Sequence, residues 1–207
     1  MQGLLIKGLI GAALGLGLYA SDAQAQGFHL GVKVGANMYK NSSDYVVDKY
    51  YGYPLGGVYL GLSGEKMSLM VEGNFTQTSM VTGDNFNEVF RSYIKNGREQ
   101  IDDARFTFTE FSVPVLLGFK VLPATWLELG PQFTKIVSMN DKEDVLNEIR
   151  DVYKDSYVSA AIGLRIKLPL HFHVSARYVH GLSDINRTSV NDTWSTRHIQ
   201  LGVGFGF

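Results

Sequence analysis

The 207-residue chain contains no cysteine, which excludes disulfide bonds, thiolate metal sites and cysteine nucleophiles. Charged residues make up only 19% of it and the net charge is -1, so no strong field would attract nucleic acid. Beyond the amino-terminal segment, no apolar run reaches the roughly 20 residues that a membrane-spanning helix needs. We expect no nucleic-acid partner, no metal and no cofactor. If the chain that follows the amino-terminal segment inserts into a membrane, it must do so as a closed barrel.

The amino-terminal 25 residues have the three-part pattern of a secretory signal peptide. Lys7 and the amino terminus precede an apolar run over residues 9–20, which is too short for a membrane anchor. Ala23-Gln24-Ala25 matches the small-residue cleavage site, with Ala23 and Ala25 in its two small positions. We predict cleavage after Ala25, export of the chain, and a mature domain over residues 26–207.

Apolar and polar residues alternate in seven segments of the mature chain, which predicts β-strands. In the first segment, Leu30, Val32 and Val34 alternate with Gly31 and Lys33. The alternating segments cover residues 28–39, 67–76, 107–121, 127–134, 158–168, 172–178 and 198–207.

An eighth segment, residues 51–63, is typical of a strand but ambiguous in phase. Val58, Leu60 and Leu62 alternate in one phase, and Tyr53, Leu55 and Tyr59 alternate in the other. Gly56-Gly57 is a candidate β-bulge that would switch the phase. With this segment the strands number eight.

The connections between these segments alternate in length. Short turns fall at residues 64–66, 122–124 and 169–170, and long connections at 40–50, 79–104, 137–156 and 180–195. Short periplasmic turns with long outer loops are typical of bacterial outer-membrane barrels. We predict an all-β fold: an eight-stranded antiparallel up-and-down transmembrane β-barrel in the cell outer membrane.

A soluble, lipocalin-like barrel would also alternate, with its apolar face inward. Three features favour the membrane alternative, and the third is the aromatic last strand that ends in Phe207. The apolar face is almost free of charge, and Lys135 and Arg197 fall at outer strand ends, where a charge facing lipid costs little. The polar face is rich in glycine, which suits the crowded interior of a small barrel. The glycines are Gly31, Gly35, Gly118, Gly130, Gly163, Gly202, Gly204 and Gly206.

Aromatic residues fall near the predicted strand ends, as in the two aromatic girdles that anchor barrels at the membrane interfaces. They are Phe28, Tyr39, Phe75, Trp126, Tyr157, Phe172, Tyr178, Trp194 and Phe207. The chain ends in an alternating aromatic strand, and Phe205 and Phe207 match the carboxy-terminal signal by which barrel-assembly machinery recognises its clients. We therefore expect two partners, outer-membrane lipid and, during biogenesis, the barrel-assembly machinery.

Four stretches resemble the PorT-like outer-membrane β-barrel family of Bacteroidetes. They are residues 27–37, residues 113–118, residues 127–132 and the glycine-rich last strand. The resemblance extends over the whole mature chain and implies a porin-like outer-membrane barrel. It also implies, as one alternative, an accessory role in type IX protein secretion.

Charged residues on the inward face predict a network of salt bridges inside the barrel, because a charge in a narrow lumen must find a partner. The predicted network comprises Lys33, Glu72, Glu110, Glu128, Arg165 and Arg177. Lys120, Lys167, His173 and His198 share this face. A paired polar plug is one interpretation, and a narrow gated pore is the alternative.

A second alternative is an enzyme that modifies lipid A, since His173-Val174-Ser175 matches the His-x-Ser pair of one barrel deacylase. This pair faces inward near the periplasmic end, whereas that chemistry needs a site facing lipid in the outer leaflet. We therefore expect no catalytic residues and no enzyme.

Two long connections carry apolar residues at helical spacing, in residues 84–101 and 141–154. Such helices would either cap the barrel mouth or offer an interaction surface to a protein partner. We name Phe86, Phe90, Ile149 and Tyr153 as the candidate loop interaction surface. The predicted function is that of a structural or interaction protein acting through its extracellular loops.

Overall fold

In the computed structural model, eight antiparallel strands form a closed barrel in which each strand pairs with its neighbours in sequence and β1 pairs with β8. The strands are β1 (Gly27–Ser42), β2 (Tyr51–Ser63), β3 (Met67–Val81), β4 (Arg105–Leu122), β5 (Thr125–Asp141), β6 (Ser156–Lys167), β7 (Phe172–Gly181) and β8 (Ser195–Gly206). The structure describes residues 27–42, 49–83, 91–95, 104–141, 152–188 and 194–207. No helix in these ranges is long and apolar enough to cross a membrane.

Apolar side chains cover the outer wall, and polar side chains fill the interior. On β1, Val32 and Val34 are exposed, whereas Lys33 between them is 3% exposed. The same pattern recurs on β8, where Leu201 and Val203 face outward. A barrel with an apolar outer wall fits a lipid environment, because a soluble barrel turns its apolar face inward.

The phase of β2 is set by Val58, Leu60 and Leu62, which face outward, while Leu55 and Tyr59 face the lumen. The predicted bulge at Gly56-Gly57 is wrong, since β2 pairs with β1 without a register shift from Tyr51 to Ser63.

An irregularity lies instead between β4 and β5. Glu110 pairs with Ile136 and Thr109 with Ser138, so Val137 is an extra residue on β5. A bulge of this kind shifts the alternation beyond it and bends the strand. Ile136 is buried, and the residues that follow it are mostly exposed.

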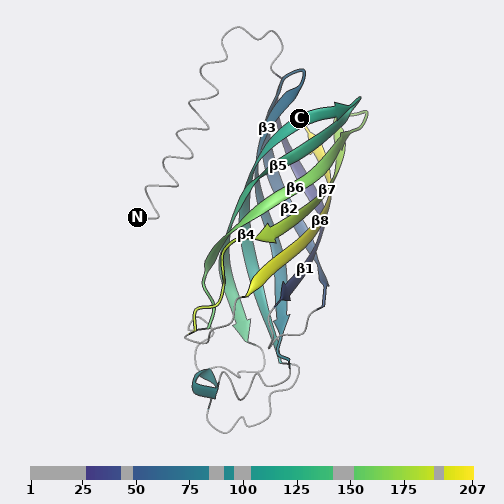
Figure 1. Ribbon diagram of the computed structural model, residues 1–207. Helices are drawn as coiled ribbons and strands as arrows, with labels where there is room; N and C mark the ends of the chain where they lie inside the picture. The colour runs from purple at the N-terminus through teal and green to yellow at the C-terminus, as the bar shows by residue number, and fades with distance from the viewer. Residues whose placement is uncertain (1–26, 43–48, 84–90, 96–103, 142–151, 189–193) are drawn as a thin grey trace.

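The two ends of the barrel differ, as the connection lengths predict. The short turns and the carboxy terminus lie at one end, and the long connections lie at the other (Figure 1). Several strands run further toward the long connections than the alternation indicated, with β3 reaching Val81 and β5 reaching Asp141. Residues 79–81 are all buried, and Met80 belongs to an apolar cluster with residues of the connecting segments such as Ile94 and Tyr153.

The aromatic residues divide into two groups. Phe28, Phe75, Phe172, Tyr178 and Phe207 are exposed on the outer wall or at its ends, as the girdle prediction requires. Tyr39, Trp126, Tyr157 and Trp194 are buried, so assigning them to the girdle was wrong. Trp194 lies just before β8 and packs inward, whereas the other three occupy inward positions of their strands.

Candidate functional site

The middle of the lumen is filled by an ion cluster centred on Glu72 of β3. Lys33 Nζ donates to Glu72 Oε2 at 2.9 Å, and Arg177 donates two hydrogen bonds, at 3.0 Å to Oε2 and 2.8 Å to Oε1. Asn74 Nδ2 also donates to Oε2, at 2.9 Å. Each of these four residues is at most 3% exposed. Charge-assisted hydrogen bonds satisfy this buried carboxylate, which is the condition for keeping a charge in a narrow interior.

The cluster continues toward the periplasmic end through Glu128 of β5. Arg177 Nη2 lies 3.5 Å from Glu128 Oε2, and Arg165 Nε lies 2.5 Å from Glu128 Oε1. Arg165 also donates to Ser68 Oγ at 3.3 Å, and its guanidinium lies 5.6 Å from the ring centroid of Trp126. The structure thus brings five of the six predicted charges together, as Lys33, Glu72, Arg177, Glu128 and Arg165.

Glu110, the sixth, belongs to a different group, so its assignment to the salt-bridge network was wrong. Thr78 Oγ1 donates to Glu110 Oε1 at 2.9 Å, and Tyr157 Oη donates to Oε2 at 3.1 Å. Tyr157 Oη also lies 3.2 Å from His198 Nε2, and His198 Nδ1 lies 3.2 Å from Asn37 Oδ1. Two hydroxyl groups therefore replace the expected cation at this buried carboxyl, and the His198 imidazole bonds to one of those hydroxyls.

The inward face also carries an apolar layer, which binary alternation did not reveal. Tyr59, Met70, Leu116, Ala161 and Val179 form one buried cluster inside the barrel. Apolar side chains exclude water and separate the hydrogen-bonded groups. Together, the ion cluster and this layer fill the lumen with side chains, as expected for eight strands.

A second apolar cluster, which we call the extracellular cap, closes the opposite end. It joins inward residues of β3, β4, β5 and β6 to residues of the connecting segments. Its members are Met80, Ile94, Ala104, Phe106, Phe108, Ile136, Val152, Tyr153, Tyr157, Ile185 and Trp194, with Tyr93 and Met139 packed against them.

Trp194 and Tyr153 lie at the centre of the cap. Their ring centroids are 4.9 Å apart, and Tyr153 packs on Phe108 at 4.7 Å. Asp184 Oδ1 accepts a hydrogen bond of 2.9 Å from the backbone N–H of Trp194, which ties the 182–188 segment to the start of β8. Burial raises the pKa of Tyr153 well above its ordinary range, so its hydroxyl stays protonated and bonds to the sulfur of Met80.

Tyr153 was predicted to belong to the loop interaction surface, but it is 1% exposed and lies inside the cap. That part of the prediction is wrong, and for Tyr153 the capping alternative holds. Phe86, Phe90 and Ile149 lie outside the described residues. In the predicted helical segment 84–101, the described part contains a short 3-10 turn, Arg91–Tyr93, followed by Ile94 in the cap. Trp194 was assigned to a girdle, and its hydrogen bond to Asp184 was not predicted. Asp184 Oδ1 also accepts from the backbone N–H of Asn186, and the tendency of aspartate to bond backbone two residues on was the available signal for a turn here.

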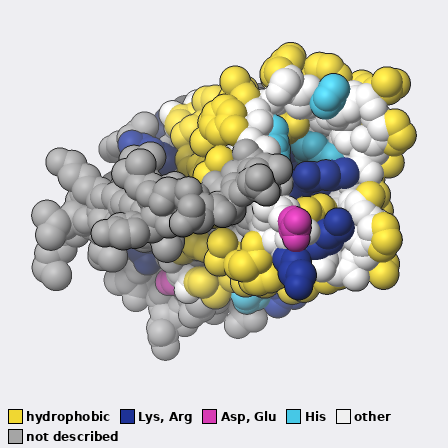
Figure 2. Space-filling view, turned by 90° about the horizontal axis from the view of Figure 1, so that it is seen from above, with side chains coloured by type: hydrophobic (Ala, Val, Ile, Leu, Met, Phe, Trp, Pro, Cys, Tyr) yellow, Lys and Arg dark blue, Asp and Glu magenta, His cyan; other side chains and the backbone are white. Residues whose placement is uncertain are grey.

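Basic side chains gather at the periplasmic mouth, which Figure 2 shows from above. Lys167 Nζ lies 3.4 Å from Ser63 Oγ and 5.2 Å from the ring centroid of Trp126. Ser63 Oγ in turn lies 2.9 Å from a ring nitrogen of His29. Lys120, expected inside, is exposed where β4 ends.

In the His-x-Ser pair, the histidine does not face lipid: His173 is 5% exposed and packs edge-on against Tyr59. Ser175 is half-buried next to the inward-facing Gly202 and lines a groove in the outer wall. In the described part of the chain, no group of three His, Asp or Glu side chains is placed to hold a metal ion.

A closed eight-stranded barrel with an apolar outer wall, a polar lumen, short turns at one end and long connections at the other is an outer-membrane β-barrel. The model of the outer membrane protein beta-barrel domain matches residues 22–187, and the chain belongs to that family.

The fold is also that of two solved outer-membrane proteins. The attachment invasion locus protein Ail of Yersinia pestis superimposes with a TM-score of 0.50 at 14% identity, covering 88% of this chain and 100% of Ail. OprG of Pseudomonas aeruginosa gives a TM-score of 0.50 at 12% identity, covering 89% of this chain and 97% of OprG. At these identities the likeness concerns the fold alone. A comparison with curated proteins gives no match.

Proposed function

We propose that this chain is a structural or interaction protein whose closed barrel holds its extracellular loops at the cell surface. The observation that carries the proposal is that the lumen is occupied at two levels, by the ion cluster around Glu72 and by the extracellular cap. A filled lumen favours a function outside the barrel, and the longest connections all lie on the extracellular side. Recognition by an apolar loop segment is a common mode of protein binding.

Crosslinking will test the loop surface. A photo-crosslinking residue at Phe90 or Ile149 is expected to give products with a second protein in intact cells, because these apolar positions are proposed to face a partner. The matched control is the same residue at Tyr153, which is buried in the cap and should react only within the chain. If all three positions gave only intramolecular products, the proposed interaction surface would be refuted.

Conductance separates the interaction protein from the narrow-pore alternative. The purified barrel in planar bilayers is expected to give no reproducible open channel, because paired side chains and the cap fill the lumen. Bilayers with detergent alone and with a general porin serve as controls. A stable single-channel current from the folded barrel would favour the pore.

The finer proposal is that the chain is PorT-like and acts as an accessory component of type IX secretion in Bacteroidetes. The stretches 27–37, 113–118 and 127–132 support it through their resemblance to that family. A crosslinked product from Phe90 or Ile149 that contains a secretion component would favour this role over a general adhesive or scaffolding one.

We also propose that the chain is not an enzyme. The burial of His173 supports this, because its imidazole packs against Tyr59 inside the barrel and could not act as a base on a lipid A ester outside it. The cleavage site at Ala23 and Ala25, and the assembly signal at Phe205 and Phe207, stay predictions. Phe205 packs on Phe172 at 5.0 Å and on Phe207 at 5.4 Å, so the terminal aromatic residues are held against the neighbouring strand.

A further inference from the structure

Two features of the outer wall fall on the same three neighbouring strands, β1, β8 and β7. The first is a row of basic side chains at the extracellular strand ends. Lys40 pairs in register with Arg197, and Arg197 pairs with His180. All three occupy outward positions of the alternation and are partly exposed, and we call them the basic row.

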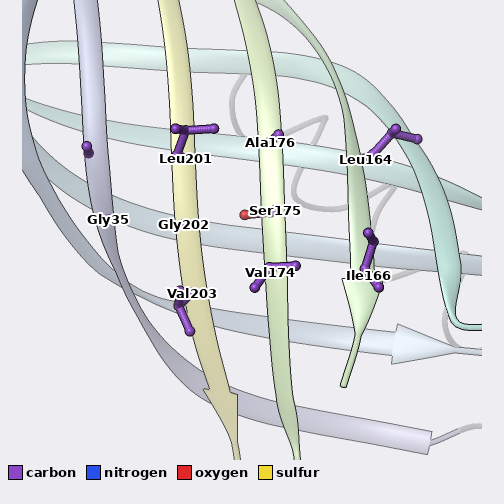
Figure 3. Close-up of a pocket in the computed structure, with 10 residues that line it drawn as sticks. Gly35, Leu164, Ile166, Val174, Ser175, Ala176, Leu201, Gly202 and Val203 are labelled. Carbon is purple, nitrogen blue, oxygen red and sulfur yellow. The ribbon is translucent and has the colours of Figure 1, made fainter. Parts of the chain in front are cut away.

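The second feature is an apolar groove of about 620 Å³ in the lipid-facing wall (Figure 3). The wall is depressed here because the side chains are small: Ala36 and Ala176 flank Leu201 in register, with Gly35 and Gly202 beside them. Larger side chains border it: Leu164, Ile166, Val174, Leu201 and Val203. We call this depression the wall groove.

The groove and the basic row are aligned along the strands. Ala36, Leu201 and Ala176 form one register row, and Lys40, Arg197 and His180 form another, four residues closer to the extracellular end on each strand. Four residues of a strand span about 13 Å. An amphiphile with an anionic group above an acyl chain has this same arrangement.

The basic row lies at the outer boundary of the apolar wall. Between Arg197 and the carboxy terminus, every outward residue of the last strand is apolar: Ile199, Leu201, Val203, Phe205 and Phe207. Ten residues rise about 33 Å, or about 25 Å across a membrane once the strand tilts by about 40°, which equals the height of the apolar band of such barrels. Arg197 therefore lies at the level of the outer polar headgroups.

Of the three basic side chains, Arg197 is the one that no described acid neutralises. Arg197 takes part in no ion pair with a described residue, and its buried Nε has no hydrogen-bond partner there. The His180 ring stacks on Tyr178 at 6.3 Å, and Lys40 Nζ lies 5.6 Å from the ring centroid of Tyr50. An arginine at the headgroup level that has no ion-pair partner among the described residues is suited to a phosphate oxygen.

We propose that this face binds one phosphorylated lipid of the outer leaflet, of the lipid A type. Its phosphate sits on Arg197, with Lys40 and His180 on either side, and one acyl chain lies in the wall groove over Ala36 and Ala176. This site is independent of the extracellular loops and of the function proposed for them.

Native mass spectrometry of the folded barrel with added lipid A tests the site. The wild-type protein is expected to retain one lipid A. Arg197→Ala should lower that retention at least fivefold by removing the phosphate contact, and Ala176→Leu should do the same by filling the groove. Lys135→Ala is the matched charge control, since Lys135 is an exposed outward cation on β5, away from the groove. Thr109→Leu is the matched size control, because Thr109 is a partly exposed outward residue on β4, away from both the groove and the basic row.

The heat-modifiable gel shift confirms that each variant is folded before lipid is added. Retention of lipid A by Arg197→Ala and Ala176→Leu at the wild-type level would overturn the proposal. So would an equal loss in Lys135→Ala, which would indicate general charge attraction, or equal retention of phosphatidylglycerol or of dephosphorylated lipid A. A change of oligomeric state in Ala176→Leu with lipid binding unchanged would assign the groove to a second copy instead.

Discussion

Replacing Glu72 with alanine is expected to lower the free energy of unfolding by roughly 3–5 kcal/mol, because two buried cations lose their partner. Lys33 and Arg177 are each 3% exposed and direct three charge-assisted hydrogen bonds to the Glu72 carboxylate. With that carboxylate gone, their charges remain in a dry interior, and Arg177 keeps only the longer 3.5 Å contact to Glu128. The loss reflects the unpaired charges more than the strength of the pair itself.

Urea unfolding of the barrel in lipid vesicles, followed by tryptophan fluorescence and by the gel shift, measures this change. Glu65→Ala is the control, because Glu65 lies exposed in the short turn between β2 and β3 and should change stability by no more than about 0.5 kcal/mol. Equal unfolding midpoints for Glu72→Ala and Glu65→Ala would show that the ion cluster contributes nothing to stability.

The composition of the ion cluster could be predicted only in part from the sequence. Alternation tells which residues face inward, and it placed Lys33, Glu72, Glu128, Arg165 and Arg177 correctly. It does not tell which of them meet, because Arg177 and Glu72 are 105 residues apart and lie on β7 and β3. Contacts across the lumen depend on the tilt and stagger of the strands, which strand patterns do not encode.

Glu110 shows the limit of a charge-counting argument. Its inward position was predicted, but its partners are the hydroxyls of Thr78 and Tyr157, not a cation. A buried carboxyl can be satisfied by any donor, and neutral donors leave no charge pattern in the sequence.

The extracellular cap shows a similar limit for apolar patterns. Helical spacing in the long connections predicted an apolar stripe, but an apolar stripe can pack on its own barrel or face a partner. Tyr153 and Val152 pack into the cap because the inward positions beneath them, such as Phe108 and Met80, are also apolar. Apolar residues at inward positions above the membrane level were the available signal for the cap, because a strand face in contact with water does not require apolar side chains.

Replacing Gly35 with alanine is expected to destabilise the barrel by about 3 kcal/mol or more, because the new methyl group meets backbone that cannot rotate away. A Cβ at Gly35 would overlap the carbonyl oxygen of Leu201 and lie 2.8 Å from the Cα of Gly202 on β8. β1 and β8 form the seam that closes the barrel, where Gly35 pairs with Gly202. The substitution therefore acts at the contact on which closure depends, and unclosed strand edges are costly in lipid.

Gly52→Ala is the matched control, since Gly52 also lies within a strand and its Cβ would meet nothing within 4 Å. Both substitutions reduce the freedom of the unfolded chain to a similar extent, so the difference between them isolates the overlap at the seam. The folded fraction on the heat-modifiable gel and the urea midpoint should fall for Gly35→Ala and stay at the wild-type level, or rise slightly, for Gly52→Ala. Equal stability of the two variants would mean that β1 and β8 can separate enough to hold a methyl group, and close packing at the seam would then not explain why glycine lies at this inward position.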